Sequence, residues 1–233
     1  MVRVPPERTD IVQSGLARFQ ETTSAESFAL QNAKLLKVRL SQTAIRAKLG
    51  SMVAYTGNVT FEHSGSGVAK FVKKAVTSEG QALMKCFGEG DVFVADSAQD
   101  IQLFRLQGER LTVNGRNILA FEDGIEWDIE RLRGAGAMMG GGLFNTKLEG
   151  SGWVAVVSDG PPVCLQVGAG HPPVYADPQA AVAWSSGVTT SLKTDFKAKN
   201  LIGLGSGETF QIAFGGEGWV LVQPSENKVV VPT

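Results

Sequence analysis

The stretch GEGDVFV at residues 88–94 decides the fold, because it recurs as GSGWVAV at 150–156 and GEGWVLV at 216–222. The copies are 62 and then 66 residues apart. Each is a Gly-x-Gly followed by a short run typical of a β-strand. Glycine adopts positive φ at little steric cost, so Gly-x-Gly between two alternating runs suits a hairpin turn. A hairpin is therefore predicted at each copy.

A second pattern recurs with the same period, and it places an apolar residue and alanine before an aromatic residue, glycine and a β-branched residue. It occurs as VAYTGNV at 53–59, LAFEDGI at 119–125 and VAWSSGV at 182–188. The aromatic residues are 66 and then 63 positions apart. Two independent patterns with one period indicate an internal repeat, which should be sought before any other feature.

The order of the two patterns predicts how the repeats are divided along the chain. We expect one β domain at 29–225, between an N-terminal extension and a short tail. Two units would be continuous, and the third would be split between the two ends of the domain. Pairing of those ends would close the body and remove exposed sheet edges. The predicted boundaries are 1–28 for the extension, 64–129 and 130–192 for the continuous units, 30–62 with 193–223 for the split unit, and 226–233 for the tail.

Composition fits an all-β protein and limits its function. The chain of 233 residues has 28 glycines, 43% hydrophobic residues and a net charge of −1. Many glycines point to many turns, and the near-neutral charge argues against a general affinity for nucleic acid. The sequence has neither a signal-peptide pattern nor an apolar run long enough to span a membrane as a helix, so we expect a cytoplasmic protein.

Three segments at equivalent places combine basic and apolar residues. They cover 67–76, 131–142 and 196–205, and the first has the spacing of a short amphipathic helix. Such segments either cap the ends of the β core or form a shared contact surface for a protein or membrane partner. The residues of this candidate interaction surface are Lys70, Phe71, Lys73, Lys74, Arg131, Arg133, Met138, Met139, Lys197, Lys199 and Leu201.

The usual chemical motifs give no catalytic, cofactor-binding or metal-binding residues. No phosphate-binding glycine loop or nucleophile elbow has the required spacing. Cys86 and Cys164 are expected to be small core residues, and His63 and His171 to be isolated on the surface. Acidic residues alternate along 126–130 and could bind a cation, but a solvated outer face is the simpler interpretation. We therefore expect no enzyme, no cofactor and no small-molecule substrate.

The ordered motifs resemble one known family. They include GSMVAY at 50–55, LTVNG at 111–115, GGGLF at 140–144 and GSGE at 205–208, together with the Gly-x-Gly copies. Over residues 28–225 the sequence resembles the "altered inheritance of mitochondria protein 24" family. The resemblance implies a fold similar to the tryptophan RNA-binding attenuation protein, a short double-stranded β-helix that tends to form ring-like oligomers. It implies no catalytic residues, because none is established for the family.

These observations lead to one expected function and two alternatives. We expect a non-enzymatic, homo-oligomeric binding or scaffold protein in membrane-related or stress-related assemblies. A ring-forming RNA-binding protein is the first alternative. Its best basis is Phe71 beside Lys70, Lys73 and Lys74, although fold likeness alone does not transfer function. An unrecognised enzyme or a ligand-binding β-helix is the third reading.

Overall fold

The computed structural model describes residues 15–41, 43–63, 82–131, 144–194 and 210–225. Within these ranges the protein is all-β, as the sequence predicted, and its only helical elements are two short 3₁₀ turns. The elements in chain order are η1 (Leu16–Phe19), β1 (Phe28–Asn32), β2 (Leu35–Leu40), β3 (Ile45–Lys48), β4 (Met52–His63), β5 (Leu83–Val94), β6 (Asp100–Asn114), η2 (Gly115–Asn117), β7 (Ile118–Glu122), β8 (Glu126–Arg131), β9 (Phe144–Ser158), β10 (Val163–Val167), β11 (Val174–Ala176), β12 (Ala181–Ser185), β13 (Val188–Thr194), β14 (Phe210–Gly216) and β15 (Gly218–Val222).

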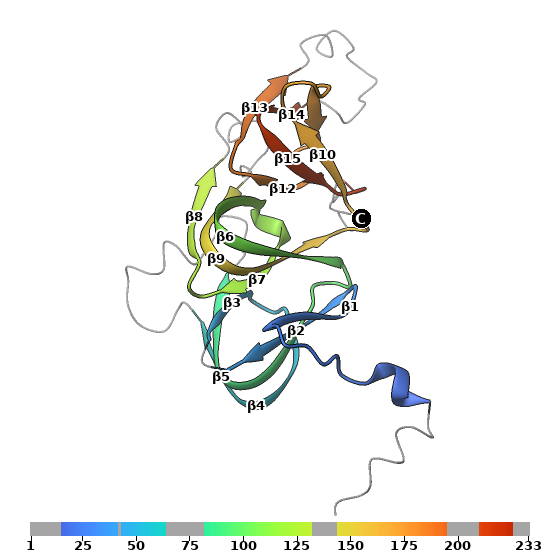
Figure 1. Ribbon diagram of the computed structural model, residues 1–233, viewed down its shortest axis with the longest axis vertical. Coiled ribbons are helices and arrows are strands. Elements are labelled where there is room, and N and C mark those ends of the chain that lie inside the picture. Colours follow the sequence, from blue (N-terminus) through green and yellow to red (C-terminus); the bar gives the residue numbers. More distant parts are fainter. Residues whose placement is uncertain (1–14, 42, 64–81, 132–143, 195–209, 226–233) are drawn as a thin grey trace, which may run out of the picture.

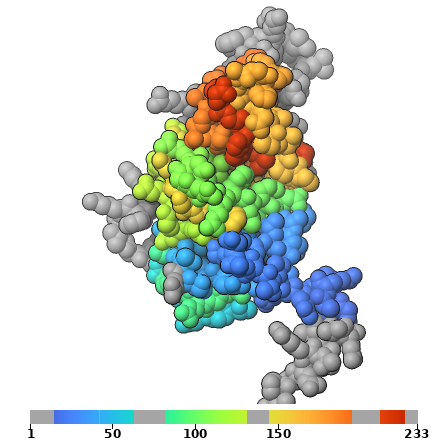
Figure 2. All heavy atoms as spheres, viewed as in Figure 1, coloured from blue at the N-terminus to red at the C-terminus, as the bar shows by residue number. Residues whose placement is uncertain are grey.

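The strands form two antiparallel sheets. The larger has the path β1-β2-β5-β3-β7-β9-β6-β12-β15-β10, with β4 on β5 and β8 on β9, and the smaller has the order β11-β14-β13. The molecule is elongated: strands β1–β5 lie at one end of the long axis and β10, β13, β14 and β15 at the other (Figure 1). The space-filling view shows the same progression of chain segments from one end to the other (Figure 2).

The Gly-x-Gly copies adopt the expected backbone but not the expected turn. Their φ values are +122° and +151° at Gly88 and Gly90, and the other two copies are similar: +126° and +147° at 150 and 152, and +82° and +146° at 216 and 218. The glycines lie inside β5 and β9 and between β14 and β15, where the chain runs on without reversing. The predicted hairpin turns are wrong, because the copies lie within a strand or between two successive strands that do not pair with each other. At Gly88, Gly90 and Gly216 the facing backbone lies too close for a side chain, whereas at Gly152 and Gly218 a Cβ would meet the side chains of Glu122 and Ser185.

The Ala-aromatic copies occupy one kind of position beside those glycines. Ala54, Ala120 and Ala183 each pair three residues beyond the second glycine, opposite Phe93, Ala155 and Leu221. In every case the pairing register shifts just before the alanine, between 52 and 54, 118 and 120, and 181 and 183. The apolar residue that precedes each alanine therefore lies where the regular strand pairing is interrupted, as it is at a β-bulge.

The predicted closure of the chain on itself is wrong. Within the described residues, the strands of 30–62 pair with β1, β5 and β7, and those of 193–223 pair with β10, β11, β12 and β13. No described pairing joins the two groups, and they lie at opposite ends of the molecule (Figure 1). The described strands of each group instead find their partners at their own end of the molecule or next to it, so the two ends of the domain stay apart.

Three hydrophobic clusters follow one another along the molecule. The first contains residues of β1–β5 together with Leu119 and Ala120. The second contains residues of β6–β9 together with Val182 and Ala183. The third contains only residues between 165 and 222. The apolar-alanine pair of β7 or β12 thus completes the core that precedes it in the chain.

Candidate functional site

Neighbouring parts of the sheet meet at two junctions that use the same strand pairing. At the first, β3 lies antiparallel to β7, with Ala47 opposite Ala120 and Arg46 opposite Phe121. At the second, the end of β6 lies antiparallel to β12, with Val113 opposite Ala183 and Thr112 opposite Trp184. The two junctions differ in the polar residues along their outer side.

Ion pairs fill the outer side of the β3–β7 junction. The carboxylate of Asp123 lies 2.7 Å from Nε of Arg46 and 2.8 Å from Nζ of Lys85. The guanidinium carbon of Arg46 also lies 5.8 Å from the ring centroid of Trp127, within cation–π range. All four groups hold one another in place, so this junction is tied together by charge and aromatic contact.

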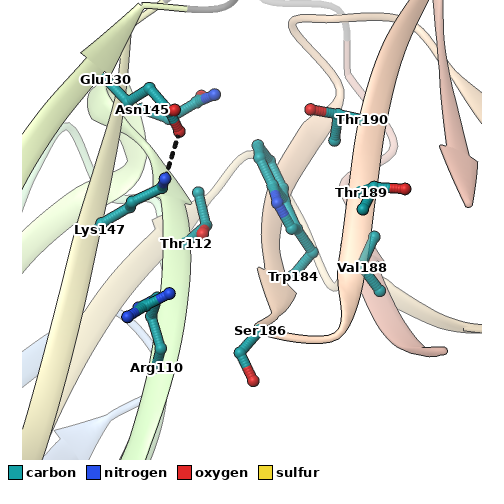
Figure 3. A pocket seen from close by; sticks show the side chains of 10 residues that line it. All are labelled: Arg110, Thr112, Glu130, Asn145, Lys147, Trp184, Ser186, Val188, Thr189 and Thr190. Carbon is teal, nitrogen blue, oxygen red and sulfur yellow. Dashed lines mark ion pairs between the residues drawn. The ribbon is translucent and has the colours of Figure 1, made fainter. Parts of the chain in front are cut away.

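At the β6–β12 junction, Ser186 and Thr112 occupy the positions that correspond to Asp123 and Arg46 at the first junction. A groove of about 290 Å³ lies beside them. Figure 3 shows Trp184 facing this groove from β12, with Lys147 and Glu130 on its opposite wall. Its lining residues are Arg110, Thr112, Glu130, Asn145, Lys147, Trp184, Ser186, Val188, Thr189 and Thr190.

The groove has hydrogen-bonding groups, but its charges are already paired. Nζ of Lys147 lies 2.8 Å from the carboxylate of Glu130. The guanidinium of Arg110 lies 2.6 Å from the carboxylate of Glu149. Hydroxyl and amide groups remain to hold a small polar molecule beside the indole of Trp184. The ten described lining residues include neither histidine nor cysteine, so they do not supply the usual nucleophile–base pair.

Almost all of the candidate interaction surface lies outside the described residues. Arg131 is the last residue of β8, where its backbone pairs with Phe144. The ten other residues named for this surface fall in 64–81, 132–143 and 195–209, which the structure does not describe. The described strands do fix where these segments attach: they join β4 to β5, β8 to β9, and β13 to β14, and each of these strand pairs is an antiparallel hairpin.

The acidic and histidine residues do not form a metal site in the described part of the chain. Glu126, Asp128 and Glu130 are exposed, and Glu130 is paired with Lys147. His171 is exposed as expected. Among the residues with a described placement, no group of three His, Cys, Asp or Glu side chains is arranged to hold a metal ion.

One cysteine lies in the core and the other does not. Cys86 is fully buried in the first cluster, whereas Cys164 is exposed on β10, so the prediction for Cys164 was wrong. The difference arises because β10 is an edge strand of the larger sheet, which leaves one side of it open to solvent. Burial raises the pKa of the Cys86 thiol to about 11 from its ordinary value of 9.0.

The pKa of Cys86 predicts a loss of stability at high pH. A thiol whose folded-state pKa is raised favours the folded protein only while it stays protonated, so its contribution falls as pH rises between 9.0 and about 11. The free energy of unfolding measured with urea should fall over this range more steeply for the wild type than for Cys86→Ala. In Cys164→Ser, the one remaining thiol should react with a disulfide reagent only after unfolding. Rapid native labelling of Cys86 would contradict its burial.

Sequence reasoning missed three large exposed apolar side chains. Val53 and Tyr55 on β4 are 58% and 49% exposed, and Tyr175 on β11 is 44% exposed. The counterparts of Val53 and Tyr55 in the second copy of the Ala-aromatic pattern are buried: Leu119 and Phe121 are 0% exposed. The residue types do not distinguish the copies, because burial depends on whether a further strand lies alongside, as β3 and β6 do at β7 and β12.

The comparisons with known proteins agree with this architecture. A crystal structure of a Streptococcus pyogenes protein superimposes with a TM-score of 0.67 at 23% sequence identity, covering 85% of this chain and 92% of that one. At this identity the likeness shows the fold alone. No curated protein matches the sequence. No described helix is long and apolar enough to cross a membrane.

The sequence comparison identifies the family. The family model described as "Mitochondrial biogenesis AIM24" matches residues 28–225, which takes in every described strand. The match begins where β1 begins and runs past the end of β15. The chain therefore belongs to the mitochondrial biogenesis AIM24 family.

Proposed function

We propose that the protein is a non-enzymatic, self-assembling scaffold whose three segments rich in basic and apolar residues bind an anionic membrane surface. The proposal depends above all on one observation: the segments 64–81, 132–143 and 195–209 each join the two strands of a hairpin that carries a Gly-x-Gly copy. One rigid β body therefore anchors three segments rich in basic and apolar residues. Several weak contacts on one body reinforce one another.

The recurrence of pairing supports a scaffold of three units, with boundaries that differ from those expected from sequence. In each unit, the strand that carries the Gly-x-Gly copy pairs with a different strand along each of its two edges, and one of these partners forms a hairpin with it. Leu40, Leu106 and Val167 all pair with the second glycine of their unit. On this basis the units are continuous and span 28–94, 100–158 and 163–222. Their fold is then a threefold repetition of the short β-helix type implied by the family resemblance.

The composition of the three segments favours a lipid surface. Apolar side chains enter the headgroup region while neighbouring lysine and arginine side chains attract anionic lipids. The first segment contains Lys70, Lys73 and Lys74 with Phe71, and the third contains Lys197 and Lys199 with Leu201. The second adds Arg131 and Arg133 with Met138 and Met139. The net charge of −1 makes such local clusters, rather than the whole molecule, the source of attraction.

Charge reversal in the first segment tests the proposal. Each basic residue near an anionic surface contributes about 1 kcal/mol, so changing Lys70, Lys73 and Lys74 to Glu should weaken binding roughly 100-fold or more. Co-sedimentation with vesicles that contain phosphatidylserine measures the effect, and neutral vesicles should retain neither protein.

A matched control reverses three basic residues on the described surface. Arg18→Glu, Lys34→Glu and Arg105→Glu make the same change in net charge at exposed side chains outside the segments. The surface ion pairs of Lys34 and Arg105 contribute little to stability. This control should retain most vesicle binding. Equal loss of vesicle binding in both variants would refute a binding surface formed by the three segments. Retention on single-stranded RNA with a steep salt dependence, but not on vesicles, would favour the RNA-binding alternative.

A further inference from the structure

At one end of the molecule, a segment of β4 has no partner strand equivalent to those that β7 and β12 have at the two internal junctions. Residues 53–58 of β4 are all exposed, although they belong to the first copy of the Ala-aromatic pattern. Their counterparts at β7 and β12 pair with β3 and β6, and there Ala120 and Ala183 are 0% exposed. In the described residues, β4 pairs only with β5.

At the other end, β11 lacks the corresponding partner: among the described strands, none lies on it as β7 lies on β3 and β12 on β6. Val174 pairs with Phe214 two residues before a Gly-x-Gly, as Ile45 pairs with Cys86 and Leu111 with Leu148. β11 thus corresponds to β3 and to the end of β6, the strands that accept β7 and β12. Within the described chain, β11 pairs only with β14.

The hydrophobic cores show the same incompleteness. Leu119 and Ala120 complete the first core, and Val182 and Ala183 complete the second, but the third receives no such pair. Ile45 and Leu111 are accordingly 1% and 2% exposed, whereas their counterpart Val174 is only partly buried. The residues that would complete the third core are Val53 and Ala54 of β4, a strand at the far end of the same molecule (Figure 1).

We infer that copies of this chain assemble head to tail, with β11 of one copy paired antiparallel to residues 52–56 of β4 in the next. This inference rests on the self-assembly in the proposed function and specifies its interface. The two internal junctions set the register. Val113 and Ala47 lie opposite Ala183 and Ala120, so Ala176 lies opposite Ala54. Thr112 and Arg46 lie opposite Trp184 and Phe121, so Tyr175 lies opposite Tyr55.

A second copy is the occupant that fits this surface. The new junction repeats a pairing that the chain already makes twice, places Val53 and Ala54 over the third core, and pairs the open edges of two strands. An exposed, apolar strand edge is a template for such pairing. Because the two surfaces differ, the interface is heterologous, and repeated association yields a closed ring or an open filament.

Two variants, each blocking one end, test the inference by native mass. Val53→Asp would put an unpaired charge into the third core of the neighbour, and Tyr175→Pro would disturb an edge that must pair on both sides. Each variant alone should fall from the assembled mass of the wild type to that of one chain, 24.7 kDa. A 1:1 mixture should form dimers only, because the intact β11 of the Val53→Asp variant can pair with the intact β4 of the Tyr175→Pro variant and no other pairing is open.

The mixture also controls for folding, since two misfolded variants could not form the dimer. A wild-type protein that is monomeric, single variants that assemble like the wild type, or a mixture that stays monomeric would each overturn the inference. Vesicle binding reports separately on the proposed function. A monomer that still binds phosphatidylserine vesicles refutes the head-to-tail junction alone, whereas an assembly that binds no vesicles refutes the membrane role alone.

Disulfide crosslinking tests the register itself. In a Cys164→Ser background, Ala54→Cys together with Ala176→Cys should give a ladder of disulfide-linked multimers, because directly opposite residues lie within disulfide range. Ala54→Cys with Tyr175→Cys is the matched control. Adjacent residues of a strand point to opposite faces, so this pair should remain uncrosslinked. Equal crosslinking of both pairs would overturn the proposed register.

Discussion

Replacing Gly90 by alanine should cost more than about 3 kcal/mol of folding free energy, because steric overlap adds to backbone strain. Gly90 has a φ of +151° inside β5, and a Cβ there would overlap the carbonyl oxygen of Thr56 in β4. That oxygen belongs to a strand backbone, so it cannot move without disturbing the β4–β5 ladder. Urea unfolding followed by tryptophan fluorescence should show a much lower midpoint.

Gly108→Ala is the matched control for this effect. Gly108 also has positive φ, +95°, but a Cβ at that position would meet nothing within 4 Å. Its substitution should cost only the backbone strain, about 1–2 kcal/mol. The difference between the two variants isolates the close approach of strands. If both variants lost the same stability, the close approach of β4 to Gly90 would contribute nothing beyond the backbone strain.

Replacing Phe121 by alanine should cost about 3–5 kcal/mol, the range for removing a buried aromatic side chain. Phe121 is 0% exposed, and its ring packs edge-on against Trp127 with centroids 6.3 Å apart. The loss would leave a cavity in the second core beside the β3–β7 junction. Thermal and urea unfolding measured at low protein concentration should both report it.

Tyr55→Ala provides the comparison at the same place in the pattern. Tyr55 packs edge-on against Phe61 at 5.2 Å, as Phe121 packs against Trp127, but it is 49% exposed. The substitution should cost less than about 1.5 kcal/mol in the isolated chain, because little area returns to water. Its main effect should appear in the native mass of the assembly. If Phe121→Ala and Tyr55→Ala lowered the stability of the monomer equally, Tyr55 would be as well buried as Phe121 within a single chain.

The two sequence patterns predicted much of the fold, but one step of the argument was wrong. Positive φ at the Gly-x-Gly copies and strands around them were confirmed, as was the all-β class. The hairpin interpretation was wrong, because Gly-x-Gly within a strand and in a turn require the same backbone freedom. Pairing of 30–62 with 193–223 was also wrong, since a period in sequence does not specify which strand edges meet.

The candidate site was harder to predict than the fold. The basic and apolar segments were chosen for composition, and all of their named residues except Arg131 lie outside the described ranges. The groove beside Trp184 brings together residues from 110 to 190, which no local pattern could connect. The exposed Val53 and Tyr55 follow the same pattern as buried residues elsewhere, so their exposure could not be deduced from residue type.

By itself, the sequence determined that this protein is all-β, with positive φ at the glycines of the Gly-x-Gly copies, because residue type and local periodicity govern strand formation and backbone conformation. Only the tertiary structure decided which Ala-aromatic segments are covered. Burial depends on whether another strand lies alongside, and that is a property of the whole arrangement. The GEGDVFV stretch thus specifies a strand with positive φ at its two glycines, whereas Val53 and Tyr55 stay in solvent because β4 has no second partner strand among the described residues.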